Sequence, residues 1–149
     1  MGDLIMYKES DLGECVRLYV EAFNAPPLEY DFLTAEKAQR YLSDMTRTPG
    51  FLGYCYWADG EMVAFCFGIL DNYFECVMFE VEELAVAPQL HRSGVGSKVM
   101  QLLETKLAMY GVAAVSLQTS RNLPAFDFYK KNDYEELPEN VTLMKWLQS

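Results

Sequence analysis

A strand, a loop and a helix meet in the stretch Val86-Ala87-Pro88-Gln89-Leu90-His91-Arg92-Ser93-Gly94-Val95-Gly96. An apolar, strand-like segment precedes it and apolar residues at helical spacing follow it, so a helix is expected to begin near Gly94. A helix N-terminus presents unpaired N–H groups and a partial positive charge, and glycine lets the backbone approach an anion closely. The stretch therefore indicates either an anion site or a sharp turn without a ligand. Residues 91–96 are named the glycine loop below.

The glycine loop does not match two familiar phosphate-binding motifs. The Walker A pattern G-x-x-x-x-G-K-[ST] and the dinucleotide pattern G-x-G-x-x-G are both absent from this stretch. Arg92 and Lys98 add positive charge beside the two glycines. The remaining hypothesis is a pyrophosphate site of another type.

Outward from this loop, apolar spacing and turn residues predict the element order β-α-α-β-β-β-α-β-α-β-β. Helices are expected to start at Ser10, Thr34, Gly94 and Asn122, and strands are expected over residues 4–7, 51–57, 62–70, 76–86, 112–119, 134–137 and 141–147. An antiparallel meander thus precedes one β-α-β crossover. The expected fold class is α/β, of the mixed α+β type. Six to seven strands should form a mixed, mostly antiparallel sheet flanked by four helices. The whole chain, residues 1–149, is expected to be a single domain.

Charge and hydropathy narrow the classes of partner. The chain carries a net charge of −10, which disfavours nucleic-acid binding because a nucleic acid needs a basic face. An acidic surface suits a cationic partner such as an amine, or serves solubility alone. The longest apolar run, residues 63–70, is too short to cross a bilayer, so no membrane partner is expected.

The cysteines and the single histidine do not form a metal-ligand pattern. None of the four cysteines belongs to a C-x-x-C pair, so no metal is expected. Buried, reduced thiols suit a reducing compartment, and the first eight residues do not resemble a secretory signal. We therefore expect a cytoplasmic protein.

A second motif follows downstream, in Asn122-Leu123-Pro124-Ala125-Phe126-Asp127-Phe128-Tyr129-Lys130-Lys131-Asn132-Asp133-Tyr134. Together with residues 82–96, it resembles the two motifs of the GNAT superfamily of N-acetyltransferases, separated as in that family by one helix and one strand. His91 stands where the family usually has Arg or Gln, and Asp133-Tyr134 stands where it has Gly-Phe. Asp tolerates a left-handed backbone better than most residues, so the turn at Asp133 can survive.

The resemblance implies the GNAT fold and acetyl-CoA as cofactor. In the family, the glycine loop wraps the pyrophosphate through main-chain N–H groups, and the end of the preceding strand bonds the pantetheine arm. The main-chain N–H of Leu84 would polarise the thioester carbonyl, whereas Asn122 either bonds the pantetheine arm or caps a helix. The implied cofactor-binding residues are Leu84, Ala85, Val86, His91, Arg92, Ser93, Gly94, Val95, Gly96, Ser97, Asn122 and Tyr129.

Acetyl transfer to an amine needs a base, an acid and a donor for the thioester oxygen. The resemblance assigns Tyr129 as the acid that protonates the leaving sulfur; a packed aromatic residue is the alternative. Glu82 stands where some members of the family have a catalytic Glu. Glu83 is the second candidate, because a bulge in the strand would change which side chain faces the site. Both carboxylates could instead bind a cationic substrate or lie at a solvent-exposed edge of the sheet.

The amine that accepts the acetyl group is the least determined part of the expected reaction. The loop over residues 24–33 is expected to form part of its wall, and the expected substrate-binding residues are Glu29, Tyr30, Phe32 and Glu82. The expected partner is a small-molecule primary amine, such as a polyamine, an aminoglycoside-like sugar or an amino acid; a peptide N-terminus is a further candidate. A CoA-binding sensor without turnover, a non-catalytic interaction module and a homodimer are left open.

Overall fold

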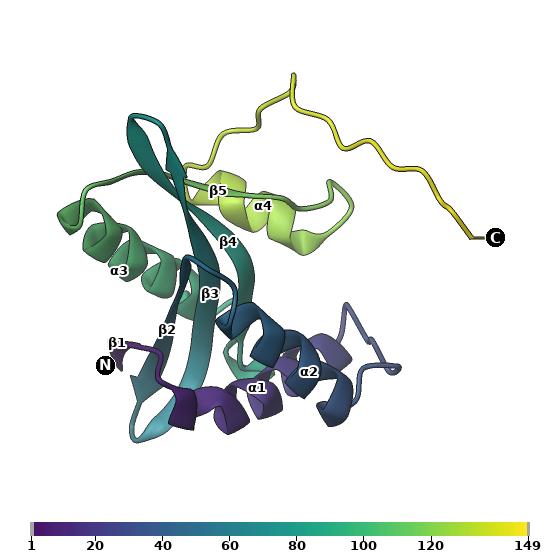
Figure 1. Ribbon diagram of the computed structural model, residues 1–149. Helices are drawn as coiled ribbons and strands as arrows, with labels where there is room; N and C mark the ends of the chain where they lie inside the picture. Colours follow the sequence, from purple (N-terminus) through teal and green to yellow (C-terminus); the bar gives the residue numbers. More distant parts are fainter. Residues whose placement is uncertain (1, 149) are drawn as a thin grey trace. The chain divides into compact units, whose positions relative to one another are not determined.

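The computed structural model describes residues 2–148, in two compact units. The larger unit ends at Gln118 and the smaller unit begins at Thr119. The larger unit contains a sheet of β1 (Gly2–Met6), β2 (Phe51–Ala58), β3 (Glu61–Tyr73), β4 (Cys76–Val86) and β5 (Val112–Leu117), with helices α1 (Leu12–Asn24), α2 (Ala35–Thr46) and α3 (Val95–Met109). The strands lie in the order β1-β2-β3-β4-β5 (Figure 1). β1 to β4 form the expected antiparallel meander, and β5 pairs in parallel with β4 after the crossover through α3.

The helices of the larger unit cover opposite faces of its sheet. Neighbouring residues of β2 show this, because successive side chains of a strand point to opposite faces. Cys55 lies 3.9 Å from Cys15 of α1, measured between the two sulfurs, while the ring of Tyr54 lies 6.0 Å from the Lys106 ammonium of α3. α1 and α2 therefore share one face and α3 covers the other (Figure 1).

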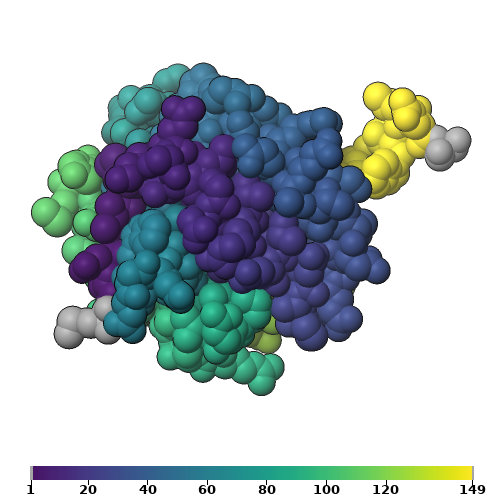
Figure 2. All heavy atoms as spheres, turned by 90° about the horizontal axis from the view of Figure 1, so that it is seen from below, coloured from purple at the N-terminus to yellow at the C-terminus, as the bar shows by residue number. Residues whose placement is uncertain are grey.

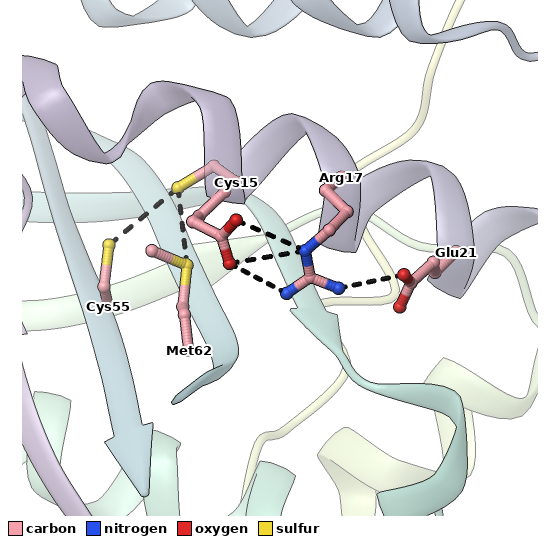
Figure 3. Close-up of polar contacts among 6 residues, drawn as sticks. Cys15, Arg17, Glu21, Cys55 and Met62 are labelled. Atoms are coloured by element: carbon pink, nitrogen blue, oxygen red, sulfur yellow. Dashed lines mark hydrogen bonds and ion pairs between the residues drawn. The ribbon is translucent and has the colours of Figure 1, made fainter. Parts of the chain in front are cut away.

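α1 is amphipathic, and its two sides can be followed in Figure 3. On the buried side, the Cys15 sulfur also contacts the Met62 sulfur at 3.8 Å, and both side chains are almost fully enclosed. On the solvent side, Arg17 bonds Glu14 and Glu21 at 3.0 and 2.9 Å. Exposed pairs of this kind contribute about 0.2–1 kcal/mol each, so burial of the apolar side decides the position of the helix.

Local signals set most of the element boundaries as predicted. The Thr34 hydroxyl accepts the Lys37 N–H at 3.2 Å and caps α2. Asp59 and Gly60 form the β2–β3 turn with φ angles of 52° and 79°. Ser10, by contrast, does not cap α1. It lies in a 3₁₀ turn (Glu9–Asp11) that Asp11 stabilises by accepting the Lys8 N–H at 3.0 Å, and this delays the helix to Leu12.

The smaller unit contains one helix, α4 (Pro124–Lys131), among its described residues. It begins two residues later than predicted at Asn122, because Pro124 suits the first helical turn and the preceding Leu123 is extended. Asp133 follows the helix with φ of 69°, the left-handed backbone expected where the related motif has glycine. The Tyr129 ring packs between Phe128 and Tyr134, with centroids 4.9 and 5.3 Å away.

The prediction of strands over residues 134–137 and 141–147 is wrong. Both segments lack regular secondary structure, so residues 2–148 contain five strands rather than six to seven. The apolar alternation that suggested them is real, but Leu143 is 90% and Trp146 81% exposed. Alternation makes a segment compatible with a strand, whereas a strand exists only where a neighbour accepts its hydrogen bonds. The mixed fold class with four helices is confirmed.

No helix within residues 2–148 is long and apolar enough to span a bilayer, the longest being the 15-residue α3.

Candidate functional site

A β-bulge in β4 separates the two candidate glutamates. Phe67 of β3 pairs with Glu83, but the next residue, Gly68, pairs with Val81, so Glu82 is the extra residue. Glu82 is exposed, whereas Glu83 is half-buried and points toward α1 and α2. The bulge therefore turns Glu83, and not Glu82, into the interior of this face of the sheet.

The absence of a side chain at Gly68 permits this bulge. A methyl group there would overlap the Phe79 ring and the Glu80 carbonyl oxygen of β4. We expect Gly68→Ala to lower the free energy of unfolding by about 1–3 kcal/mol, because backbone and ring would both have to shift. Urea unfolding would measure the loss.

Gly13→Ala is the matched control for this substitution. Gly13 lies in the first turn of α1, and a methyl group there meets no atom within 4 Å. Alanine is the better helix former by up to about 1 kcal/mol, so the control should keep or gain stability. Equal effects of the two substitutions would contradict the role given to Gly68.

Glu83 is held by a tyrosine of α2. The Tyr41 hydroxyl donates a hydrogen bond to Oε2 of Glu83 at 2.7 Å. Burial raises the pKa of Glu83; the hydroxyls of Tyr41 and Tyr19 oppose this by hydrogen bonding, and the Glu82 charge adds to it. Burial, followed by the charge of Glu83, raises the pKa of both Tyr41 and Tyr19, so both phenols remain proton donors at neutral pH. Glu83 is thus a carboxyl of raised pKa beside two neutral phenols.

We expect Tyr41→Phe to raise the pKa of Glu83 further. The hydrogen bond favours the charged carboxylate, so its removal favours the protonated form and raises the pKa. A carbon-detected NMR titration of the Glu83 carboxyl measures the change. Tyr73→Phe, at the exposed end of β3, should leave the pKa in place. A fall, or no change, in the Tyr41→Phe protein would contradict this assignment.

The backbone of β4 has an open edge beside Glu83. Pairing with β5 ends at Val81 and Leu117, while pairing with β3 continues to Val86. Over the described residues, the backbone of residues 82–86 is therefore bonded by a strand on one side only. An extended ligand with amide groups can add to such an edge as a further strand does.

The glycine loop links this open edge to α3. Gly94 precedes the helix with φ of 91°, a conformation that favours glycine, and it has no side chain to cover the helix N-terminus. His91 turns back, its Nε2 2.8 Å from the Val86 carbonyl oxygen, and the Ser93 hydroxyl donates to the Leu90 carbonyl oxygen at 2.5 Å. These two side chains thus shape the loop, and the Ser93 hydroxyl also accepts the Val95 N–H of α3 at 3.4 Å. The N–H groups at the start of a helix can bind an anion, so the pyrophosphate site stays a prediction.

The predicted acceptor loop folds back on the end of α1. The Tyr30 N–H donates to the Phe23 carbonyl oxygen at 2.8 Å, and the Tyr30 ring stacks on Phe23 and Phe32 at 5.9 and 5.4 Å. Glu29 is exposed and adopts φ of 49°.

Three residues near this site were not singled out in the sequence: Tyr19, Phe23 and Tyr41. Their helical spacing is that of ordinary core residues, and nothing local shows that Tyr19 and Tyr41 meet a carboxylate 42 or more positions away in the chain.

Tyr129 and Asn122 belong to the smaller unit. Tyr129 is buried among its aromatic neighbours, and Asn122 is exposed, its N–H bonded to the Ser120 hydroxyl at 3.2 Å. Neither the packing of Tyr129 nor the hydrogen bond of Asn122 assigns a chemical role to these residues. Across residues 2–148, no three His, Cys, Asp or Glu side chains are grouped so as to hold a metal ion.

Comparison with known families gives a match that spans both motifs. The sequence model described as the Acetyltransferase (GNAT) family matches residues 13–134, most of the chain. No curated protein matches.

Solved structures share the fold at low sequence identity. A possible acetyltransferase from Clostridium difficile 630 superposes with a TM-score of 0.80 at 10% identity, covering 99% of both chains. An acetyltransferase of Trypanosoma brucei is 21% identical, with a TM-score of 0.69 over 97% of this chain and 100% of its own. An aminoglycoside acetyltransferase from an uncultured soil metagenomic sample, in complex with sisomicin, is 18% identical, with a TM-score of 0.76 over 99% and 97%.

Proposed function

The chain belongs to the GNAT family of acetyltransferases and is an acyltransferase; from this we propose that it transfers an acetyl group from acetyl-CoA to a primary amine of a small molecule. The observation that carries the proposal is the open edge of β4, which has the half-buried Glu83 beside it and leads through the glycine loop to the N-terminus of α3. A single continuous segment of chain thus carries the residues proposed for the cofactor-binding edge, the phosphate site and the base.

Acetyl-CoA supplies the activated acetyl thioester, and its chemistry fits the residues present. Its pyrophosphate suits the N–H groups at the start of α3, with Arg92 and main-chain groups of the glycine loop beside it. Its pantetheine amides suit the side of Leu84, Ala85 and Val86 that faces away from β3, where β5 no longer pairs and His91 contacts only the Val86 carbonyl oxygen. The Leu84 N–H is assigned to the thioester oxygen, whose negative charge grows during transfer.

Glu83 is the better candidate for the base. An amine is protonated at neutral pH, and it must lose a proton before its nitrogen can attack the thioester carbon. The pKa of both glutamates is raised, chiefly by burial, so geometry separates them: only Glu83 is half-buried toward α1 and α2 and is oriented by the Tyr41 hydroxyl. Glu82, displaced outward by the bulge, is assigned to attract the cationic acceptor.

The rest of the transfer follows from these assignments. Glu83 takes the first proton from the ammonium group, and the free amine nitrogen then forms the new C–N bond while the C–S bond breaks. Tyr129 is assigned to give its phenolic proton to the departing sulfur, as the family resemblance implies, and the second proton that the nitrogen loses restores the phenol. Asn122 is assigned to the pantetheine arm on the same basis.

Two observations support an amine acceptor. The net charge of −10 favours cations, and some structural neighbours are aminoglycoside acetyltransferases by name. A peptide N-terminus is the second candidate acceptor. All four cysteines are free thiols, and this suits a cytoplasmic protein. The family match extends over both compact units, and this suits a single catalytic domain.

Calorimetric titration with acetyl-CoA and a free-thiol assay over an amine panel test the proposal. We expect binding of acetyl-CoA and thiol release that depends on the amine. Binding without release from any amine or peptide would indicate a sensor. Absence of binding would indicate an interaction module and end both CoA-based functions.

A further inference from the structure

A pocket of about 480 Å³ opens in the larger unit, at the edge of the sheet formed by β1. Four segments line it: the end of β1, the start of α1, the end of α2 and the start of β2. Small-molecule sites usually have volumes of about 300–1,000 Å³ and combine an apolar lining with a few polar groups. We name this site the β1 pocket.

The β1 pocket is separate from the proposed acetyltransferase site. The open edge of β4 lies beyond β3 in the strand order, and no residue of β4 or of the glycine loop lines the pocket. Figure 2 shows α1, in purple, beside α2, in blue. The start of α1 meets the end of α2 at the pocket, so the two helices run in opposite directions. The loop between them therefore lies at the far end of α1, about 20 Å away for a helix of 13 residues.

One part of the pocket lining is apolar. The rings of Tyr7 and Phe51 meet edge to face, with centroids 5.6 Å apart and planes inclined by 86°. Both rings also pack against the fully buried Phe67, at 5.1 and 5.0 Å. The aliphatic lining residues are Met6, Leu12 and Leu52. Because the edge-to-face contacts hold both rings in position, this wall is formed before a ligand arrives.

The charged part of the lining is positive, although the chain as a whole carries a net charge of −10. Lys8 and Arg47 line the pocket together with a single carboxylate, Glu9. The Arg47 guanidinium is anchored by the Ser43 hydroxyl and by Asp44, which offsets part of its charge. None of the ion pairs within residues 2–148 includes Lys8. The pocket thus offers an unpaired ammonium beside a guanidinium that is already fixed in place.

The helix ends at the pocket also favour an anion. Leu12 is the first residue of α1, so the positive end of the helix dipole lies beside the lining. The last carbonyl oxygens of α2 are not free to bind a cation. Those of Ser43, Asp44 and Met45 already accept hydrogen bonds from groups within residues 46–48.

We propose that the β1 pocket binds a small aromatic carboxylate, an aryl ring joined to a carboxylate by a short chain. The carboxylate lies at Lys8 and Arg47, and the ring packs on Tyr7 and Phe51. These residues take no part in the proposed acetyl transfer, so binding here does not depend on that reaction.

An amide NMR titration of the full chain with phenylacetate tests the proposal. We expect the amide signals of Tyr7, Arg47 and Gly53 to shift together, with a Kd of about 0.1–1 mM, as for a ligand of about ten non-hydrogen atoms. Phenylacetamide keeps the ring without the charge, and acetate keeps the charge without the ring. Each should bind about tenfold more weakly than phenylacetate, or weaker still.

Lys8→Gln removes the unpaired charge from the pocket. It should raise the Kd of phenylacetate about threefold to tenfold and leave that of phenylacetamide unchanged. Lys98→Gln is the matched control, because it makes the same change at an exposed lysine of α3, on the other face of the sheet. Its Kd for phenylacetate should equal that of the parent protein.

The contrary results are equally specific. An equal rise of the Kd in Lys98→Gln, or shifts centred on the glycine loop, would place phenylacetate at the start of α3 and overturn the β1 pocket as its site. Phenylacetamide bound as tightly as phenylacetate would overturn the role of the charge. No shift of the Tyr7, Arg47 and Gly53 amides up to about 10 mM phenylacetate would overturn the site itself. None of these results bears on acetyl transfer.

Discussion

Glu83→Gln is expected to lower kcat by about 10²–10⁴-fold, the usual contribution of a positioned general base. The amide keeps the size of the side chain and can still accept the Tyr41 hydrogen bond, so the fold and the site geometry should persist. It cannot take a proton from the acceptor. Steady-state thiol release measures kcat, and circular dichroism verifies the fold.

Glu82→Gln is the matched control for this substitution. It changes the same functional group one residue away, on the exposed side of the bulge. Its main effect should be on the KM of a cationic acceptor, through one lost surface charge, with kcat within about tenfold of the parent. A larger loss of kcat in Glu82→Gln than in Glu83→Gln would reverse the assignment.

The pH profile adds an independent check on Glu83. Its pKa is raised by burial, so the active carboxylate is lost as pH falls through a value above the usual one for glutamate. The acidic limb of kcat/KM should therefore lie at that raised pKa and move further up in Tyr41→Phe. An acidic limb that stays in place in Tyr41→Phe would argue that another group titrates.

Tyr129→Phe is expected to lower kcat by about 10²-fold, at the lower end for an acid catalyst because a thiolate leaves more easily than an alkoxide. The ring remains, so its packing with Phe128 and Tyr134 should persist and the Kd of acetyl-CoA should change little. Single-turnover kinetics and calorimetry separate the two quantities.

Tyr110→Phe is the comparison for Tyr129→Phe. Tyr110 ends α3, is exposed and has no place in the proposed chemistry. Removal of its hydroxyl should leave kcat unchanged. Full activity of Tyr129→Phe would exclude Tyr129 as the acid, and a loss of acetyl-CoA affinity equal to the loss of kcat would indicate a binding role instead.

The parts of the fold predicted well are those that local physics controls. Thr34 marks a helix start because its hydroxyl accepts the Lys37 N–H three residues further on. Gly94 precedes α3 in a left-handed conformation that favours glycine. The turn at Asp59-Gly60 and the left-handed Asp133 have the same origin. Strands 134–137 and 141–147 were predicted wrongly because pairing depends on a partner that the segment does not contain.

By itself, the sequence determined the family and the start of α3 after Gly94, and it supplied the two glutamates proposed as base, because these features are encoded in short continuous segments. Only the tertiary structure separated Glu83 from Glu82, through a bulge set by pairing with β3 and permitted by Gly68. Only it joined Tyr41 to Glu83 and placed Tyr19 beside both. These contacts link residues far apart in the chain, and such proximity exists only after the helices pack on the sheet.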